Sequence, residues 1–133
     1  MKAVDKWVKE IWDKIDHKLT HTAQKSFNKI PYTTINGVYN NKMEEDKAWW
    51  TNGFWPALMM LMYAGTQKQL YLDTARNGMD ILDSALFDIE GLHHDVGFMW
   101  NISAGVDYRL TNNQKGGRNE HFRTEKIKEV DTS

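Results

Sequence analysis

Four segments of the chain repeat apolar residues with helical spacing, and the connections between them are alternately short and long. These segments span roughly residues 4–27, 53–64, 68–86 and 97–110. The first shows the pattern most clearly, because intervals of three and four place its apolar residues on one stripe of a helix. That stripe contains Val4, Trp7, Val8, Ile11, Trp12, Ile15 and Leu19. The spacing therefore predicts a protein built from packed helices.

The turns between the segments predict how the helices are connected. Only residues 65–67 separate the second helix from the third, so we expect these two to be antiparallel neighbours. Thr51 or Asn52 is expected to cap the second helix, Pro56 to lie in its first turn, and Gly65 to end it. The connection over 31–46 is long and contains turn signals, of which Asn36-Gly37 is one.

The alternation of short and long connections predicts an all-α fold of stacked antiparallel helical hairpins, as in an α/α toroid or an α-solenoid. No segment alternates with a period of two over enough residues to predict a sheet. We expect the hairpins to occupy residues 1–111. Residues 112–133 are rich in charge and contain Gly116-Gly117, so we expect a polar tail with at most a weak helix over 122–130.

Composition excludes several classes of function. The net charge of −1 argues against a general nucleic-acid or membrane-surface binder, which would carry a basic excess. Cysteine is absent, so no disulfide framework or thiolate metal site can form. The apolar run over 54–63 is too short to cross a bilayer, and the N-terminus lacks the apolar core of a signal peptide. We therefore expect a cytoplasmic protein.

A cluster of tryptophans marks the start of the second helix, in the sequence Trp-Trp-Thr-Asn-Gly-Phe-Trp-Pro over 49–56. Backbone N–H groups are unpaired at such a helix start and favour an anionic group. Indole rings also form flat walls on which the C–H face of a sugar ring can stack. A helix start with ordinary aromatic packing would produce the same sequence, and the pattern alone does not separate the two interpretations.

The sequence His-His-Asp-Val-Gly-Phe over 93–98 stands at the start of the fourth helix. Asp95 there is either a helix N-cap or a carboxylate beside a histidine, suited to acid–base work or to binding sugar hydroxyls. A metal site is the less favoured interpretation, because adjacent residues point in different directions and no His-x-x-x-His is present.

Together, these two segments resemble a known enzyme family. Residues 50–55 are similar to the Trp-Thr-Asn/Asp-Gly-Phe-Trp motif of the unsaturated glucuronyl and rhamnogalacturonyl hydrolases, glycoside hydrolase families 88 and 105. Residues 93–98 are similar to the family's His-His-Asp-hydrophobic-Gly-Phe motif, and residues 106–111 look like its next helix end. The resemblance covers roughly residues 7–111.

The resemblance implies an (α/α)6 barrel and a substrate ending in a 4,5-unsaturated uronic acid. In the reaction it implies, a carboxylic acid protonates the alkene carbon and water adds at the next carbon. The resulting hemiketal opens and releases the sugar, with no metal or other cofactor. By the same resemblance, Asp95 is the first essential carboxylate, His94 contacts the substrate, and Trp50 packs against the unsaturated ring.

The resemblance ends near Thr111, and the family's proton-donating aspartate belongs to a later hairpin. The sequence therefore predicts a truncated or frameshifted form of the enzyme with little or no activity. We also expect apolar helix faces to be exposed and to favour self-association. Two other interpretations stay open, a non-catalytic carbohydrate-binding module and a helical interaction scaffold.

Overall fold

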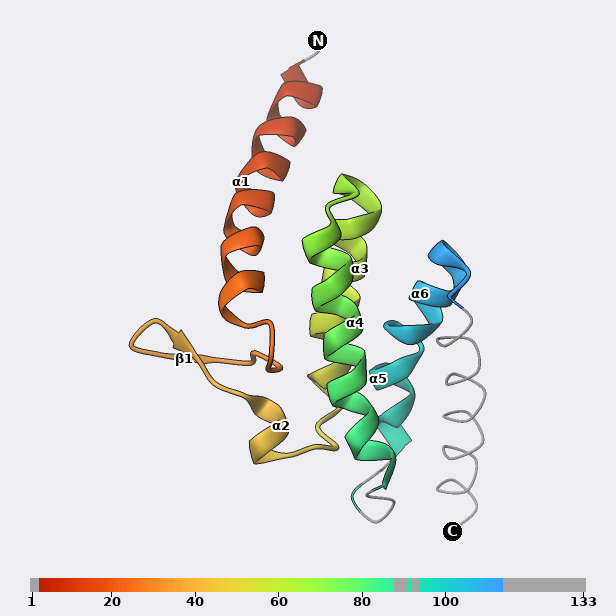
Figure 1. The fold of residues 1–133 in the computed structure, drawn as a ribbon. Coiled ribbons are helices and arrows are strands. Elements are labelled where there is room, and N and C mark those ends of the chain that lie inside the picture. The colour runs from red at the N-terminus through yellow and green to blue at the C-terminus, as the bar shows by residue number, and fades with distance from the viewer. Residues whose placement is uncertain (1–2, 88–90, 92–93, 114–133) are drawn as a thin grey trace.

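The computed structural model describes residues 3–87, 91 and 94–113, and it confirms the predicted all-α class. Most of its residues lie in helices (Figure 1). The helices are α1 (Ala3–Lys25), α2 (Lys42–Glu45), α3 (Phe54–Thr66), α4 (Gln69–Asp83), α5 (Gly97–Trp100) and α6 (Ala104–Thr111). Short 3₁₀ helices are η1 (Trp50–Gly53), η2 (Ser84–Phe87) and η4 (His94–Val96), and the strands are β1 (Thr34–Ile35) and β2 (Val38–Tyr39).

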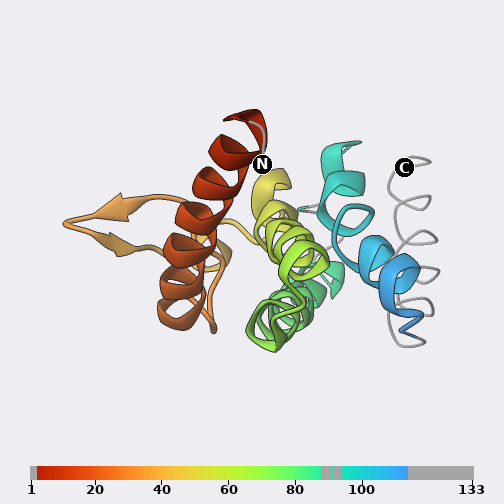
Figure 2. The ribbon, with the colours of Figure 1, turned by 90° about the horizontal axis from the view of Figure 1, so that it is seen from above.

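The helices form three layers, with α1 on one side, the α3–α4 pair in the middle, and α5 with α6 on the other side (Figure 2). The predicted antiparallel pairing of the second and third helices is confirmed by α3 and α4, which pack along their length. Their close packing depends on Gly78 of α4, because a Cβ atom there would lie 3.3 Å from Cβ of Pro56 on α3.

The core is rich in methionine, whose unbranched side chain fits irregular spaces between helices. It joins α3 to both neighbouring layers through buried side chains, among them Met59, Met60, Met62, Met79, Met99, Tyr71, Leu82 and Trp100. Burying one such apolar side chain contributes about 1.5–3 kcal/mol. The α3–α4 pair is therefore the centre of the fold.

Helix α1 is amphipathic as expected, but much of its apolar stripe faces solvent. The side chain of Trp7 is 62% exposed, and Val8, Ile11 and Ile15 are exposed as well. Helix α1 packs on the core through Trp12, Leu19 and the fully buried Ala23. The first half of α1 extends past the other helices (Figure 1).

Two helix boundaries differ from the prediction. Gly65 does not end the second helix, because α3 continues to Thr66 and the residue with a left-handed backbone is Gln67, at φ 59°. Gly65 instead gives space to an indole ring from α1: an added Cβ would lie 2.3 Å from Cζ2 of Trp12. Neither Thr51 nor Asn52 caps α3, because Gly53 occupies the cap position. Pro56 lies in the first turn of α3, as expected.

The predicted fourth helix is interrupted. It forms α5 and α6, with a break over 101–103. At the break, Ser103 has φ −108° and ψ −83°, and its hydroxyl donates to the Met99 carbonyl at 2.6 Å. A serine side chain that bonds to a helix carbonyl competes with the backbone in this way.

The connection over 31–46 contains a small hairpin that the sequence pattern did not predict. Thr34 pairs with Tyr39 and Ile35 with Val38 in antiparallel register. The expected turn at Asn36-Gly37 is confirmed, with φ values of 52° and 78°. Positive φ at both positions is typical of the type I′ turn, whose twist suits a two-residue hairpin loop.

Polar clusters attach both outer layers to α4. Arg76 of α4 donates to Asp107 of α6 through Nε at 3.0 Å and Nη2 at 3.2 Å, and Thr111 and Asn113 donate to the same carboxylate. On the opposite side, the Tyr71 hydroxyl of α4 donates to Asp16 of α1 at 2.6 Å. Apolar packing has no preferred direction, so it does not fix how far a helix slides along its neighbour. These directional hydrogen bonds fix the position of each outer layer along α4.

Burial raises the pKa of Asp107, but hydrogen bonds from Arg76, Thr111 and Asn113 outweigh burial and hold that pKa below its ordinary value. Burial, together with the hydrogen bond to Asp16, raises the pKa of Tyr71 to about 12. Hydrogen bonds from Lys68 and Tyr71 lower the pKa of Asp16. The side chains of Asp107 and Asp16 are therefore ionised when they accept these hydrogen bonds.

No helix in the described part of the chain is long and apolar enough to span a bilayer. The polar tail expected over 112–133 lies outside the described residues except for Asn112 and Asn113.

We predict that Arg76→Met destabilises the protein by about 2 kcal/mol at neutral pH, because it leaves the buried Asp107 carboxylate without its cation. The folded-state pKa of Asp107 is lowered, so the unfolded chain binds the proton first as pH falls. The difference between wild type and variant should therefore shrink below about pH 4. Urea unfolding at several pH values measures it.

Arg109→Met is the matched control, since Arg109 is exposed and makes one long hydrogen bond of 3.4 Å to the Asn101 carbonyl. We expect it to change stability by about 0.5 kcal/mol or less. Equal losses in the two variants, or a loss in Arg76→Met that does not vary with pH, would contradict the role given to the ion pair.

Candidate functional site

The two motif segments singled out in the sequence lie against each other in the fold. Helix η1 carries the first motif, η4 and α5 carry the second, and η1 packs directly on α5. Both lie at the end of the bundle opposite the short α3–α4 turn (Figure 1). Residues more than 40 positions apart in the sequence thus meet in one place.

A glycine allows this contact. At Gly53, the last residue of η1, an added Cβ would lie 2.4 Å from the Met99 carbonyl oxygen and 2.6 Å from that of Phe98. Both are backbone atoms, which cannot move aside as the end of a flexible side chain can. Gly53 has φ −73°, so the requirement here is for space rather than for unusual backbone geometry.

Trp50, the first residue of η1, lies among aromatic side chains. Its ring centroid is 5.4 Å from that of Phe54 at 90°, and 5.8 Å from that of Phe98 at 60°. Edge-to-face pairs of this kind contribute about 0.5–1.5 kcal/mol beyond the area they bury. Phe54 and Phe98 are partly exposed, and Trp50 is half-buried, so the three rings form an accessible aromatic surface.

Asp95 and His94 lie in η4, three and four residues before Phe98. The side chain of His94 is 84% exposed and that of Asp95 is 36% exposed, with 3.4 Å between Nε2 and Oδ2. The N-cap interpretation of Asp95 is wrong, because Val96 occupies the cap position of α5. His93 lies outside the described residues.

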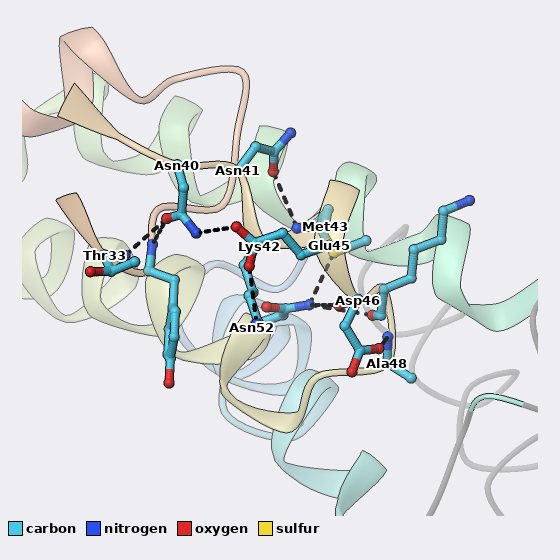
Figure 3. A network of polar contacts seen from close by, with 11 residues as sticks. Thr33, Asn40, Asn41, Lys42, Met43, Glu45, Asp46, Ala48 and Asn52 are labelled. Carbon is cyan, nitrogen blue, oxygen red and sulfur yellow. Dashed lines mark hydrogen bonds and ion pairs between the residues drawn. The ribbon is translucent and has the colours of Figure 1, made fainter. Parts of the chain in front are cut away.

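Asn52 explains how η1 is attached to the long connection before it (Figure 3). Its side chain is almost fully buried, and its amide nitrogen donates to the backbone carbonyls of Asp46 at 3.0 Å and Lys47 at 3.3 Å. The same nitrogen lies 3.2 Å from the sulfur of Met43. Asn52 therefore acts through its donors on the preceding loop, whereas an N-cap acts as an acceptor.

Two more asparagines hold the same connection (Figure 3). The Asn40 side chain accepts from the N–H groups of Tyr32 and Thr33 at 3.0 and 2.9 Å and donates to Glu45 at 2.9 Å. The Asn41 side chain accepts from the N–H of Met43 and caps α2. Side-chain amides replace the regular backbone bonds that this segment lacks.

This end of the bundle thus combines an aromatic surface with a half-exposed carboxylate and an exposed imidazole. A carboxylate can accept hydrogen bonds from sugar hydroxyls, and an aromatic face can stack on a sugar ring. Within residues 3–87, 91 and 94–113, no three His, Asp or Glu side chains gather as metal ligands would.

Of the residues chosen from the sequence, Trp50 is placed beside the segment that carries His94 and Asp95, and the contact between the segments runs through Phe98. Sequence reasoning did not assign roles to Gly53, Phe54 or Phe98. All three lie inside the two motifs, and this position in the sequence was the one indication that they belong to the site. Their roles depend on a contact between distant segments, which a linear pattern does not contain.

Among curated proteins, the chain is similar to an unsaturated chondroitin disaccharide hydrolase of Streptococcus pneumoniae, 33% identical over 66 residues. It is also similar to the enzyme of that name from Streptococcus agalactiae, 32% identical over 83 residues, and to an unsaturated glucuronyl hydrolase of Bacillus sp. strain GL1, 33% identical over 70 residues. The similarity to these hydrolases extends over 66 to 83 residues of the chain.

The aligned parts cover 49, 62 and 52% of this chain in the three cases, and 17, 20 and 19% of those relatives. The chain thus spans about a fifth or less of the length of the curated relatives that it matches. No protein-family model and no solved structure matches the chain. The resemblance to this family is therefore confirmed as a partial match, over about half of the chain or somewhat more.

We predict that Gly53→Ala destabilises the protein by about 1–3 kcal/mol, because the added methyl group overlaps backbone atoms of α5 and forces the two segments apart. Nuclear Overhauser contacts between the rings of Trp50 and Phe98 should weaken or vanish. Thermal unfolding and NMR spectroscopy together measure both effects.

Gly97→Ala is the control within the same site. The nearest atom to an added Cβ at Gly97 is Asn101 Nδ2 at 3.5 Å, an ordinary contact distance. This variant should be neutral or slightly stabilising, since alanine favours helix over glycine. If Gly53→Ala behaved in the same way, close backbone contact would not be what places Trp50 beside Phe98.

Proposed function

We propose that this end of the bundle is part of the saccharide site of a glycoside hydrolase that acts on 4,5-unsaturated uronic acid residues. The observation that carries the proposal is the contact of Trp50 with Phe98, which brings the tryptophan motif beside the segment of His94 and Asp95. The names of the curated relatives supply the substrate class.

In the proposed site, the unsaturated ring stacks on the indole of Trp50. Asp95 accepts hydrogen bonds from ring hydroxyls, and its partial exposure leaves the carboxylate accessible to a ligand. His94, still more exposed, donates to the substrate from the rim. The reaction is hydration of the vinyl ether: a proton is added to one alkene carbon, water adds to the other carbon and gives up a proton, and the hemiketal opens to release the sugar.

The proton donor for that step is not assigned to any residue of this chain. Asp107 is unsuited, because its carboxylate is held ionised by Arg76 and is fully buried. Asp95 is given a binding role, which does not require it to be protonated. The chain is therefore proposed to contribute substrate binding, with the acid supplied by a group outside the described residues.

We predict that an unsaturated disaccharide binds the 133-residue chain and that Trp50→Ala weakens this binding at least about tenfold, since an aromatic anchor in a site commonly contributes more than about 1 kcal/mol. Trp7→Ala, which removes an exposed indole from α1, should leave the affinity unchanged. Isothermal titration calorimetry measures both, and equal losses would show that Trp50 is not a specific contact.

Turnover tests the proposal that the proton donor lies outside the described residues, since loss of the alkene absorbance would contradict it. We expect binding without loss of the alkene absorbance for the 133-residue chain, and weaker binding for Asp95→Asn because a carboxylate acceptor becomes an amide. Asp73→Asn is the control, as Asp73 is exposed on α4 and accepts a hydrogen bond from Gln69, one turn earlier in the same helix. An affinity that is unchanged in Asp95→Asn, or that falls equally in Asp73→Asn, would contradict the role assigned to Asp95.

A further inference from the structure

A cavity lies between the end of α1 and the β1–β2 hairpin. It has a volume of about 240 Å³ and is lined by Lys25, Ser26, Lys29, Gly37, Val38 and Tyr39. None of these residues belongs to the site of Trp50 and Asp95. The volume is below the range of about 300–1,000 Å³ typical of drug-sized ligands, so the cavity suits a small group.

Both charged residues that line the cavity are lysines. The ammonium group of Lys29 donates to the Tyr39 carbonyl at 2.7 Å, which fixes its position at the base of the hairpin. An ammonium group carries further N–H donors beyond that one. Lys25 ends α1 and has an exposed side chain. The cavity thus combines positive charge with donors available to a ligand.

The position of Lys25 by itself has an ordinary explanation, since cations are favourable near the C-terminal end of a helix. That explanation does not extend to Ser26. Its side chain is fully buried, and its hydroxyl has no hydrogen-bond partner among the residues that the structure describes. The Thr22 carbonyl, one turn earlier in α1, accepts the Ser26 N–H at 2.9 Å but not the Ser26 hydroxyl. A buried hydroxyl without a partner is costly and calls for an acceptor.

We propose that this cavity binds a small oxyanion, with the chemistry shared by carboxylate and sulfate groups. The two ammonium groups supply charge-assisted hydrogen bonds, and the Ser26 hydroxyl donates to a further anion oxygen. The proposal does not depend on the proposed function, because the two sites share no residue and the test below measures no turnover.

The test is an NMR titration of the 133-residue chain with sodium sulfate and, separately, with sodium acetate, at constant ionic strength set by sodium chloride. We expect saturable shifts in the side-chain signals of Lys25 and Lys29 and in the amide signal of Ser26. Lys29→Met should weaken sulfate binding about tenfold. Lys25→Met should also weaken sulfate binding, and it leaves intact the hydrogen bond from Lys29 to the Tyr39 carbonyl of the hairpin.

Lys14→Met is the matched control, since it removes the same charge from an exposed position of α1 outside the cavity. Ser26→Ala should weaken binding several-fold and leave the unfolding midpoint unchanged. If Ser26 were purely structural, the substitution would lower the midpoint and leave binding unchanged. Tighter binding of acetate or of sulfate identifies which group the cavity prefers. Shifts that do not saturate, or equal weakening by Lys14→Met and Lys29→Met, would overturn the proposal.

Discussion

The close approach of η1 to α5 at Gly53 is the constraint on which the candidate site depends. No side chain stands between the two backbones, so Trp50 at the start of η1 meets Phe98 in the first turn of α5. Asn52 attaches the opposite side of η1 to the long connection through the carbonyls of Asp46 and Lys47. The position of the tryptophan is thus set by the backbone contact at Gly53 and by hydrogen bonds from the Asn52 side chain to two backbone carbonyls.

The rest of the fold supports this arrangement through α4. Apolar burial favours compact packing without specifying how helices slide along one another, and directional polar contacts supply that information. Arg76 fixes α6 through Asp107, and Tyr71 fixes α1 through Asp16. Both contacts start from the same helix, so the outer layers are positioned relative to α4 and, through it, to α3 and η1. Their ionised carboxylates make this positioning dependent on pH on the acid side.

Helical spacing was sufficient to predict which segments are helices, because that signal is local. It was insufficient at three points where distant residues decide. Gly65 has the composition of a helix end, yet the ring of Trp12 fills the space beside it and α3 continues. Ile102 and Val106 keep helical spacing, yet the helix breaks between α5 and α6, where the Ser103 hydroxyl donates to the Met99 carbonyl. The partners of Asp107 include an arginine 31 residues away. The motifs located the site, but its internal contacts could be seen only in the fold.

The two ends of the bundle differ in how they satisfy polar groups, and this difference indicates where binding belongs. At one end, a short turn joins α3 to α4, and its backbone closes on itself through the Gln67 N–H and the Tyr63 carbonyl at 2.8 Å. At the other end, the long connection relies on asparagine side chains, while the Asn52 carbonyl oxygen and the Trp49 and Trp55 indole nitrogens are buried without a partner among the described residues. Each such group costs about 1–3 kcal/mol. A fold optimised only for stability would not concentrate these costs around η1. Departures of this kind are expected at functional sites, where local rules yield to the geometry that a ligand requires.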